Sequence, residues 1–182
     1  MRTIPDFPVP GVLFRDVLPV MADAGMFRAM VAELAARARR YRPDVIVAPE
    51  ARGFLIGAPL ALDLGIAMVP VRKAGKLPGP VRVQEYALEY GKGRLEASAA
   101  RRMDGLRALV VDDVLATGGT VDAAARLVRD LGGDVSGFLF LIELVALKGR
   151  ERLLAAFGDR TASEGAGGAD GDRGPVEALW PL

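Results

Sequence analysis

Residues 109–120 constrain this chain more than any other stretch. They read LVVDDVLATGGT, so that an apolar run ends in two adjacent carboxylates and a Thr/Gly loop comes next. A short apolar run bounded by a Gly-rich turn is typical of a buried parallel strand, and segment 121–131 has the apolar spacing of a helix. We therefore expect the loop to open a helix at the carboxyl end of a strand.

A loop of this kind can bind an anion. The first backbone N–H groups of a helix lack intrahelical partners, and Gly118 and Gly119 let a ligand approach the main chain closely. The flanking threonines add hydroxyl donors. The two carboxylates, Asp112 and Asp113, could hold vicinal hydroxyls directly or through a hard cation. A phosphorylated sugar offers both a phosphate and such hydroxyls.

The rest of the chain alternates between helical and strand patterns. This alternation predicts an α/β fold with a central, mostly parallel sheet flanked by helices. Expected helices cover 25–40, 55–64, 121–131 and 148–157, and expected strands cover 45–48, 67–71, 94–98, 107–113 and 135–143. Loops 49–53 and 112–120 would then lie at the carboxyl ends of strands, where ligands bind in such sheets.

Two segments do not fit a regular core element. Residues 72–91 are rich in Gly, Pro and charge, and a loop this long in a compact domain is usually functional, so we interpret it as a lid. The segment from 158 onward is rich in Gly and poor in apolar residues, which predicts a flexible tail over 158–182. Residues 1–157 would then form a single domain.

Composition narrows the chemistry. The chain has no Cys and no His, which excludes thiolate or imidazole zinc sites, cysteine nucleophiles and the usual serine–histidine relay. Carboxylates, Arg, Lys, Tyr and an oxygen-ligated ion such as Mg²⁺ remain. The net charge of +1 gives no general attraction for nucleic acid, and we expect no targeting segment, no membrane span and a cytoplasmic location.

The 109–120 stretch resembles the phosphoribosyl-pyrophosphate motif of type I phosphoribosyltransferases. Three further stretches are similar to the adenine branch of that family: FPVPGVLFRD at 7–16, EARGF at 50–54, and RKAGKLPG through LEYG within 72–91. The segment Ile142–Leu144 also matches. Together these resemblances reach from about residue 4 to residue 154.

The resemblance implies a small N-terminal hood over about residues 1–20 and a flexible lid loop over 74–91. It also implies transfer of a phosphoribosyl group from phosphoribosyl pyrophosphate to N9 of adenine, giving AMP and pyrophosphate in purine salvage. Mg²⁺ would be the cofactor, held mainly by substrate and water with no direct protein ligand. Family members are typically homodimers, so a homodimer is expected.

The same resemblance implies catalytic roles for Arg72, Glu89, Asp112 and Asp113. Glu89 would be the general acid or base at the adenine ring, and Arg72 would stabilise the departing charge. The substrate-binding positions that it implies are Leu13, Phe14, Arg15, Arg52, Lys73, Lys76, Tyr90, Ala116, Thr117, Gly118, Gly119, Thr120 and Leu144.

Several alternatives stay open at this stage. The base could be hypoxanthine, guanine or xanthine, or the domain could be a nucleotide-sensing regulator that binds nucleic acid. A generic Rossmann or P-loop binder is disfavoured, because the chain lacks both the GxGxxG pattern and the GK[ST] ending. Leu144 could be an ordinary core residue instead of a base contact.

Overall fold

The computed structural model describes residues 2–5, 13–88, 91–161 and 175–182. Its main sheet has seven strands in the order β5-β6-β4-β3-β7-β8-β9. Their bounds are β3 (Val45–Pro49), β4 (Ala67–Lys73), β5 (Val81–Leu88), β6 (Gly91–Ser98), β7 (Arg107–Leu115), β8 (Asp134–Glu143) and β9 (Val176–Pro181). The pairs β4–β3, β3–β7, β7–β8 and β8–β9 are parallel, so the predicted mostly parallel sheet is confirmed.

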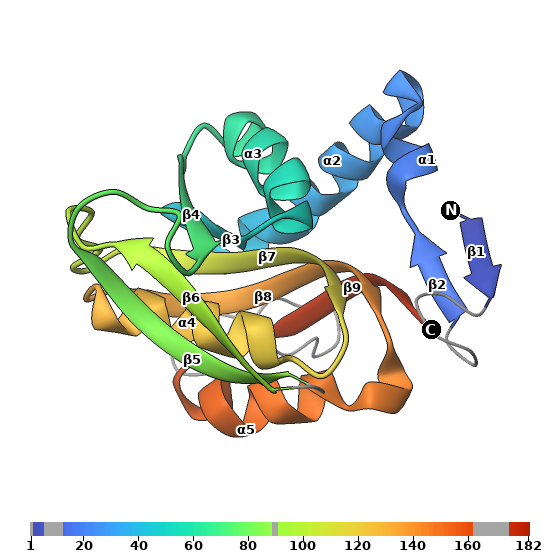
Figure 1. The fold of residues 1–182 in the computed structure, drawn as a ribbon. Helices are drawn as coiled ribbons and strands as arrows, with labels where there is room; N and C mark the ends of the chain where they lie inside the picture. The colour runs from blue at the N-terminus through green and yellow to red at the C-terminus, as the bar shows by residue number, and fades with distance from the viewer. Residues whose placement is uncertain (1, 6–12, 89–90, 162–174) are drawn as a thin grey trace.

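Helices cover both faces of this sheet, as Figure 1 shows. α2 (Ala24–Ala38) and α3 (Arg52–Leu64) lie on one face, and α4 (Gly119–Asp130) and α5 (Gly149–Thr161) lie on the other. Short helical segments complete the described chain: α1 (Leu18–Met21), η1 (Arg39–Tyr41) and η2 (Val145–Leu147). The sequence sets these limits locally, since Asp23 caps α2 by accepting from the N–H of Met26 and Gly65 ends α3 in the left-handed conformation.

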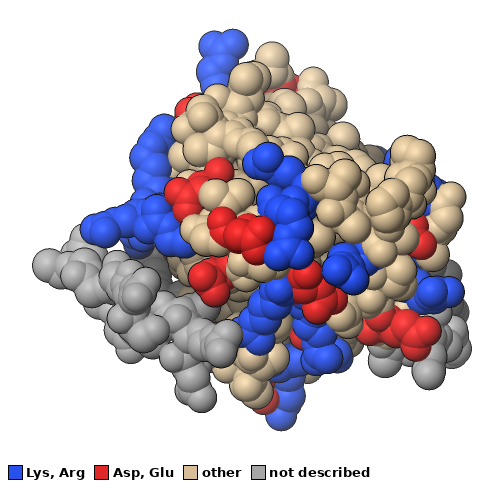
Figure 2. All heavy atoms as spheres, turned by 90° about the vertical axis from the view of Figure 1, so that its left-hand side faces the viewer, with Lys and Arg blue, Asp and Glu red and all other residues tan. Residues whose placement is uncertain are grey.

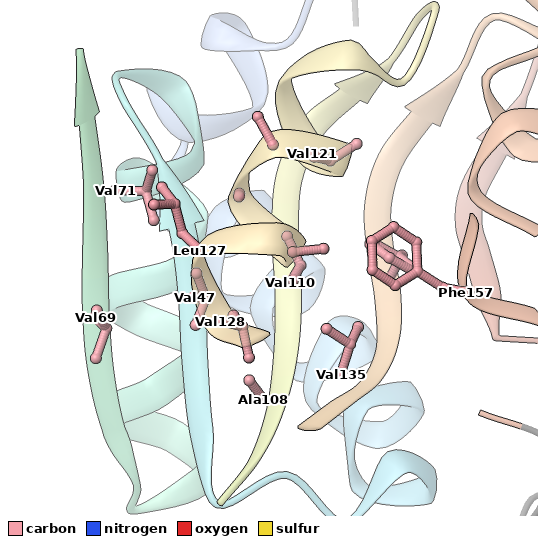
Figure 3. Packing of buried hydrophobic residues seen from close by; sticks show 14 of the residues in the cluster. Val47, Val69, Val71, Ala108, Val110, Val121, Leu127, Val128, Val135 and Phe157 are labelled. Carbon is pink, nitrogen blue, oxygen red and sulfur yellow. The ribbon is translucent and has the colours of Figure 1, made fainter. Parts of the chain in front are cut away.

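Each face of the sheet has its own apolar core. Side chains alternate along β3, so that Val45 and Val47 pack toward α4 and α5 while Ile46 packs toward α2 and α3. Figure 3 shows the first of these cores, in which Phe157 of α5 approaches the strands. Phe157 meets Phe138 edge to face with ring centroids 5.4 Å apart, which fixes α5 against β8.

The N-terminal segment lies apart from the main sheet. β1 (Arg2–Pro5) and β2 (Leu13–Asp16) form a separate antiparallel pair. Asp16 ties β1 to the start of α1, because it accepts from the guanidinium of Arg2 at 2.9 Å and from the N–H of Leu18 at 3.0 Å. This two-stranded element occupies the part of the chain that the resemblance assigns to a hood.

The segment 72–91 is more regular than its composition predicts. Our interpretation of it as a long connection without regular structure is wrong for 81–88, which form β5 and pair with β6 along their whole length. β6 in turn pairs with β4 through Arg72 and Lys73. Apart from Gly91 at the start of β6, the Gly and Pro residues of this segment lie in the turn at 75–80, and pairing with another strand supplies the order that the composition of the whole segment hides.

The prediction of a flexible tail over 158–182 is wrong at both of its described ends. α5 continues to Thr161, and 176–181 form β9, which pairs in parallel with β8. A buried carboxylate holds the strand in place: Glu177 accepts from Arg37 at 3.0 Å and from the hydroxyl of Tyr41 at 3.4 Å. Residues 162–174 lie outside the described chain.

The surface carries both signs of charge. On the face that Figure 2 shows, Lys and Arg side chains alternate with Asp and Glu, in keeping with the net charge of +1. Among the described residues, no helix has the length and apolar character needed to cross a membrane.

Candidate active site

A polar pocket of about 480 Å³ opens at the carboxyl ends of β3 and β7. It lies where the strand order of a parallel sheet changes direction, because β4 and β7 flank β3 on opposite sides. The residues that line it are Glu50, Ala51, Arg52, Lys73, Tyr86, Asp112, Asp113, Val114, Leu115, Ala116, Thr117, Gly118, Gly119, Thr120 and Val121. The two loops expected at strand ends, 49–53 and 112–120, therefore meet in one pocket.

The loop 116–119 has the backbone of an anion site. Gly118 adopts the left-handed conformation with φ +79° and precedes the first turn of α4. The first helical hydrogen bond there runs from the N–H of Asp122 to the carbonyl of Gly118, so the N–H groups of residues 119–121 precede the helical ladder. Their positive dipole end faces the pocket that they line, which suits a phosphate.

Helix α5 supports this loop from behind. A Cβ at Gly149 would collide with the carbonyl oxygen of Ala116, and a Cβ at Gly118 would lie 3.1 Å from the carbonyl oxygen of Gly149. Backbone therefore packs directly on backbone between the loop and the start of α5. Only a glycine at 149 allows this approach, a role that the sequence motifs did not reveal.

A buried carboxylate joins α4 to α5 one turn below the loop. Asp122 accepts from Arg126 of its own helix at 2.9 Å and from Arg152 of α5 at 2.9 Å. Its side chain is 4% exposed, so it depends on these two guanidinium groups for its charge balance. The pair with Arg152 fixes the position of α5 relative to loop 116–119, called the phosphate loop below, and no sequence motif indicates this pair.

Asp112 and Asp113 line the pocket side by side. Asp113 is buried and forms an ion pair with Arg52 at 2.5 Å, while Asp112 accepts from the N–H of Asp113 at 2.9 Å. Burial and the neighbouring Asp113 raise the pKa of Asp112 well above its usual range. Burial also raises the pKa of Asp113, and the guanidinium of Arg52 opposes that increase. Two such carboxylates favour a ligand that brings hydrogen-bond donors or positive charge.

Glu50 organises the basic residues at the pocket rim. Its carboxylate accepts from Lys76 at 2.7 Å, from the backbone N–H of Lys73 at 3.1 Å and from Arg72 at 3.3 Å. These contacts, led by the hydrogen bond from Lys76, lower the pKa of Glu50 to about 2. Lys73 lines the pocket, whereas Arg72 and Lys76 are not among the described residues that do so. The structure thus places two of the three expected basic residues against a carboxylate.

Several other predicted site residues are not among the described residues that line the pocket. Leu144 is half-buried against the core on the α2 and α3 face. Leu13, Phe14 and Arg15 belong to β2, and the structure describes only the backbone of these three residues. Glu89 and Tyr90 lie outside the described residues. Tyr86, which lines the pocket and packs its ring across Gly93 of β6, was not among the predicted residues.

The pocket also offers ligands for a hard cation. Among the described residues that line it, three are carboxylates and two are basic, and carboxylate oxygen is the donor that Mg²⁺ prefers. Within the same described ranges, no cluster of three or more Asp or Glu is arranged to hold a metal ion. The donor set fits a cation that shares its coordination with a bound ligand and water.

Comparison with known proteins places this chain and its fold in a family. Residues 22–154 match the phosphoribosyl transferase domain. The chain belongs to the phosphoribosyltransferase family, which confirms the resemblance carried by residues 109–120.

Within that family, the chain is similar to several adenine phosphoribosyltransferases. The enzyme of Desulfitobacterium hafniense is 52% identical over 84% of this chain and 88% of its own length, and that of Sphingopyxis alaskensis is 53% identical over 86% and 85%. Among solved structures, the enzyme of Thermoanaerobacter pseudethanolicus matches 100% of this chain and 95% of its own, with a TM-score of 0.86 and 44% identity. The Giardia lamblia enzyme, solved with 9-deazaadenine, is 31% identical with a TM-score of 0.83, and the match covers 100% of this chain and 93% of that one.

Proposed function

We propose that the protein transfers the 5-phosphoribosyl group from phosphoribosyl pyrophosphate to N9 of adenine, giving AMP and pyrophosphate. The reaction is a step of purine salvage. The observation that carries this conclusion is identity of 50% or more to adenine phosphoribosyltransferases over more than four fifths of the chain. The pocket supports it, because a helix-start loop for a phosphate lies beside two carboxylates for a sugar.

The reaction needs no covalent enzyme intermediate. The bond from the anomeric carbon to the pyrophosphate oxygen breaks, a bond from that carbon to N9 forms, and N9 loses its proton. Because pyrophosphate leaves with high charge, the barrier falls mainly through orientation and electrostatic stabilisation. The anomeric carbon gains positive character as the bond breaks, so water must be kept away from it.

We assign the groups of the substrate to parts of the pocket. The N–H groups and hydroxyls of loop 116–120 would bind the 5′-phosphate, and Asp112 and Asp113 would accept from the ribose hydroxyls. Arg52 and Lys73 would face the pyrophosphate, with Arg72 and Lys76 at the rim. Glu89 would take the N9 proton, Tyr90 would close over the reacting atoms, and Leu13, Phe14, Arg15 and Leu144 would surround the base.

We propose Mg²⁺ as the cofactor. Asp112 and Asp113 would hold it through the ribose hydroxyls and water, and it would neutralise part of the pyrophosphate charge. The support is the excess of carboxylates over basic groups among the described pocket residues, since a polyanionic substrate would otherwise meet a floor of like charge.

We also propose a cytoplasmic homodimer. Large apolar side chains are exposed on the outer helices, among them Leu62 at 83% and Met26 at 51%, which suits a subunit interface. The cytoplasm is the compartment where charged, phosphorylated substrates are available without crossing a membrane. Sedimentation velocity tests the homodimer, and cell fractionation tests the cytoplasmic location.

The test is product formation with three bases. Purified protein receives phosphoribosyl pyrophosphate, Mg²⁺ and either adenine, hypoxanthine or guanine. AMP from adenine alone is the expected result. Product from hypoxanthine or guanine instead would overturn the base assignment and keep the sugar-phosphate site. Nucleotide binding without turnover would favour the regulator alternative.

A further inference from the structure

Glu50 places a negative charge in a pocket that we propose binds the anion pyrophosphate. It lines the pocket beside Arg52 and Lys73, and its side chain is 10% exposed. A negative group at this point repels an anionic ligand. Attraction of the substrate therefore does not explain the carboxylate of Glu50.

Glu50 binds the same cations that pyrophosphate would use. Its two oxygens divide the contacts: one accepts from the ammonium of Lys76 at 2.7 Å, and the other accepts from the guanidinium of Arg72 at 3.3 Å. Both basic side chains remain partly exposed, at 47% and 35%, so solvent and ligand can reach them. An ammonium and a guanidinium each have several donors, so a second anion can contact them before their contacts with Glu50 are lost.

Glu50 is not the single anchor of the turn between β4 and β5 among the described residues. The turn between β4 and β5 is also fastened by Glu96 of β6, which accepts from the N–H of Gly75 at 3.0 Å. The strand pairs Arg72↔Glu96 and Lys73↔Leu95 fix the end of β4 as well. Glu96 anchors backbone, whereas Glu50 is bonded to two basic side chains as well as to the backbone N–H of Lys73.

We propose that Glu50 is a counter-charge that competes with pyrophosphate for Arg72 and Lys76 and so limits how tightly pyrophosphate is held. This inference rests on the proposed function. When pyrophosphate is bound, the two cations turn from Glu50 toward it. When the reaction is complete, Glu50 takes the cations back, and this exchange favours release of the product. Glu50 is thus a positioning residue, because it acts through Arg72 and Lys76.

The variant that isolates this role is Glu50→Gln. Glutamine keeps the size and can still accept from the N–H of Lys73, but it has no charge to pair with the two basic side chains. Affinity for magnesium pyrophosphate, measured by calorimetry, should rise by about threefold to tenfold, the range expected for two partly exposed ion pairs. The gain should disappear in about 0.5 M salt, since salt screens exposed charges.

Two comparisons make the experiment specific. Glu96→Gln removes a neighbouring carboxylate that anchors the same turn without a basic side-chain partner in the described chain, and it should change the affinity by less than about twofold. AMP carries no pyrophosphate, so its affinity should be the same in Glu50→Gln and in the unaltered protein.

The outcomes separate this inference from the proposed function. Unchanged or weaker pyrophosphate binding by Glu50→Gln, with normal AMP binding, would overturn the inference alone. Weaker binding of both ligands would show that Glu50 only maintains the fold, which also overturns it. If the unaltered protein binds pyrophosphate but makes no AMP, the proposed function fails. The affinity of Glu50→Gln for pyrophosphate then still tests whether Glu50 competes with pyrophosphate for Arg72 and Lys76.

Discussion

Replacing Gly149 by alanine tests how the phosphate loop is built. The new Cβ would collide with the carbonyl oxygen of Ala116 and would come within 2.8 Å of Cδ1 of Leu115. The first contact is with backbone, so no side-chain rotation relieves it. Either the loop or the start of α5 must move.

The expected cost depends on which part gives way. If the core absorbs the clash, overpacking of this kind destabilises by about 1–3 kcal/mol. A cost of about 2 kcal/mol corresponds to a fall in Tm of roughly 4–8 °C for a chain of this size. If the loop shifts instead, loss of one charge-assisted hydrogen bond to the phosphate costs about 1.5–3 kcal/mol, which weakens AMP binding by roughly tenfold or more.

The assay combines thermal unfolding with AMP calorimetry, at one protein concentration because the proposed dimerisation would also affect Tm. Gly158→Ala is the matched control on the same helix. A Cβ at Gly158 meets nothing within 4 Å, and alanine is the better helix former, so this variant should gain up to about 1 kcal/mol and bind AMP normally. The reasoning is refuted if Gly149→Ala matches the unaltered protein in both Tm and AMP affinity.

Three further predictions concern Asp112, the anchor of β9 and Glu89. The pKa of Asp112 is raised in the folded state by burial and Asp113, so its contribution to stability is fully present below about pH 4 and is lost as pH rises through the raised value. Asp112→Asn should therefore be more stable than the unaltered protein at pH 7 in urea unfolding, and the difference should vanish near pH 4. It should also bind phosphoribosyl pyrophosphate about tenfold or more weakly. Equal stability of the two proteins at both pH values contradicts the raised pKa of Asp112. Arg37→Met leaves Glu177 buried without its main partner and should lower the free energy of unfolding by about 2–4 kcal/mol. The control Arg39→Met breaks the exposed pair with Asp63 and should lower it by less than about 1 kcal/mol. Similar losses in thermal unfolding would show that β9 is not held by the carboxylate of Glu177. Glu89→Ala should lower kcat more than it raises the KM for adenine, and unchanged kcat at saturation removes Glu89 from the mechanism.

The sequence predicts the part of the site that depends on local backbone. Asp112, Asp113 and the loop 116–120 belong to one continuous stretch, and strand, turn and helix start are each indicated by neighbouring residues. The order of helices α2 to α5 and of strands β3, β4, β6, β7 and β8 is predictable for the same reason, because each of them has its own apolar pattern. Their meeting with loop 49–53 is predictable too, since carboxyl ends of parallel strands share one edge.

The elements that the sequence does not predict depend on partners far along the chain. β9 is an ordered strand because β8 pairs with it and Arg37 neutralises Glu177, 140 residues away. β5 is ordered because β6 pairs with it; it contains no Gly or Pro itself, but the Gly- and Pro-rich turn before it leads to the prediction of one long loop over 72–91. Gly149 and Arg152 likewise acquire their roles only when α5 packs behind the phosphate loop.

The sequence does not predict how the basic residues of segment 72–76 are paired. Composition predicts positive charge for a leaving pyrophosphate, yet Arg72 and Lys76 lie against Glu50, a residue 22 and 26 positions earlier. A motif shows which charges are present, but only the fold shows how they are paired.

The most direct test of the proposed reaction is a ³¹P NMR time course with adenine, phosphoribosyl pyrophosphate and Mg²⁺. We predict that the substrate phosphorus signals are replaced by those of AMP and free pyrophosphate in equal amounts, and that AMP with pyrophosphate regenerates the substrate. Hydrolysis to ribose 5-phosphate without AMP, or no change in the spectrum, would contradict the proposed transfer.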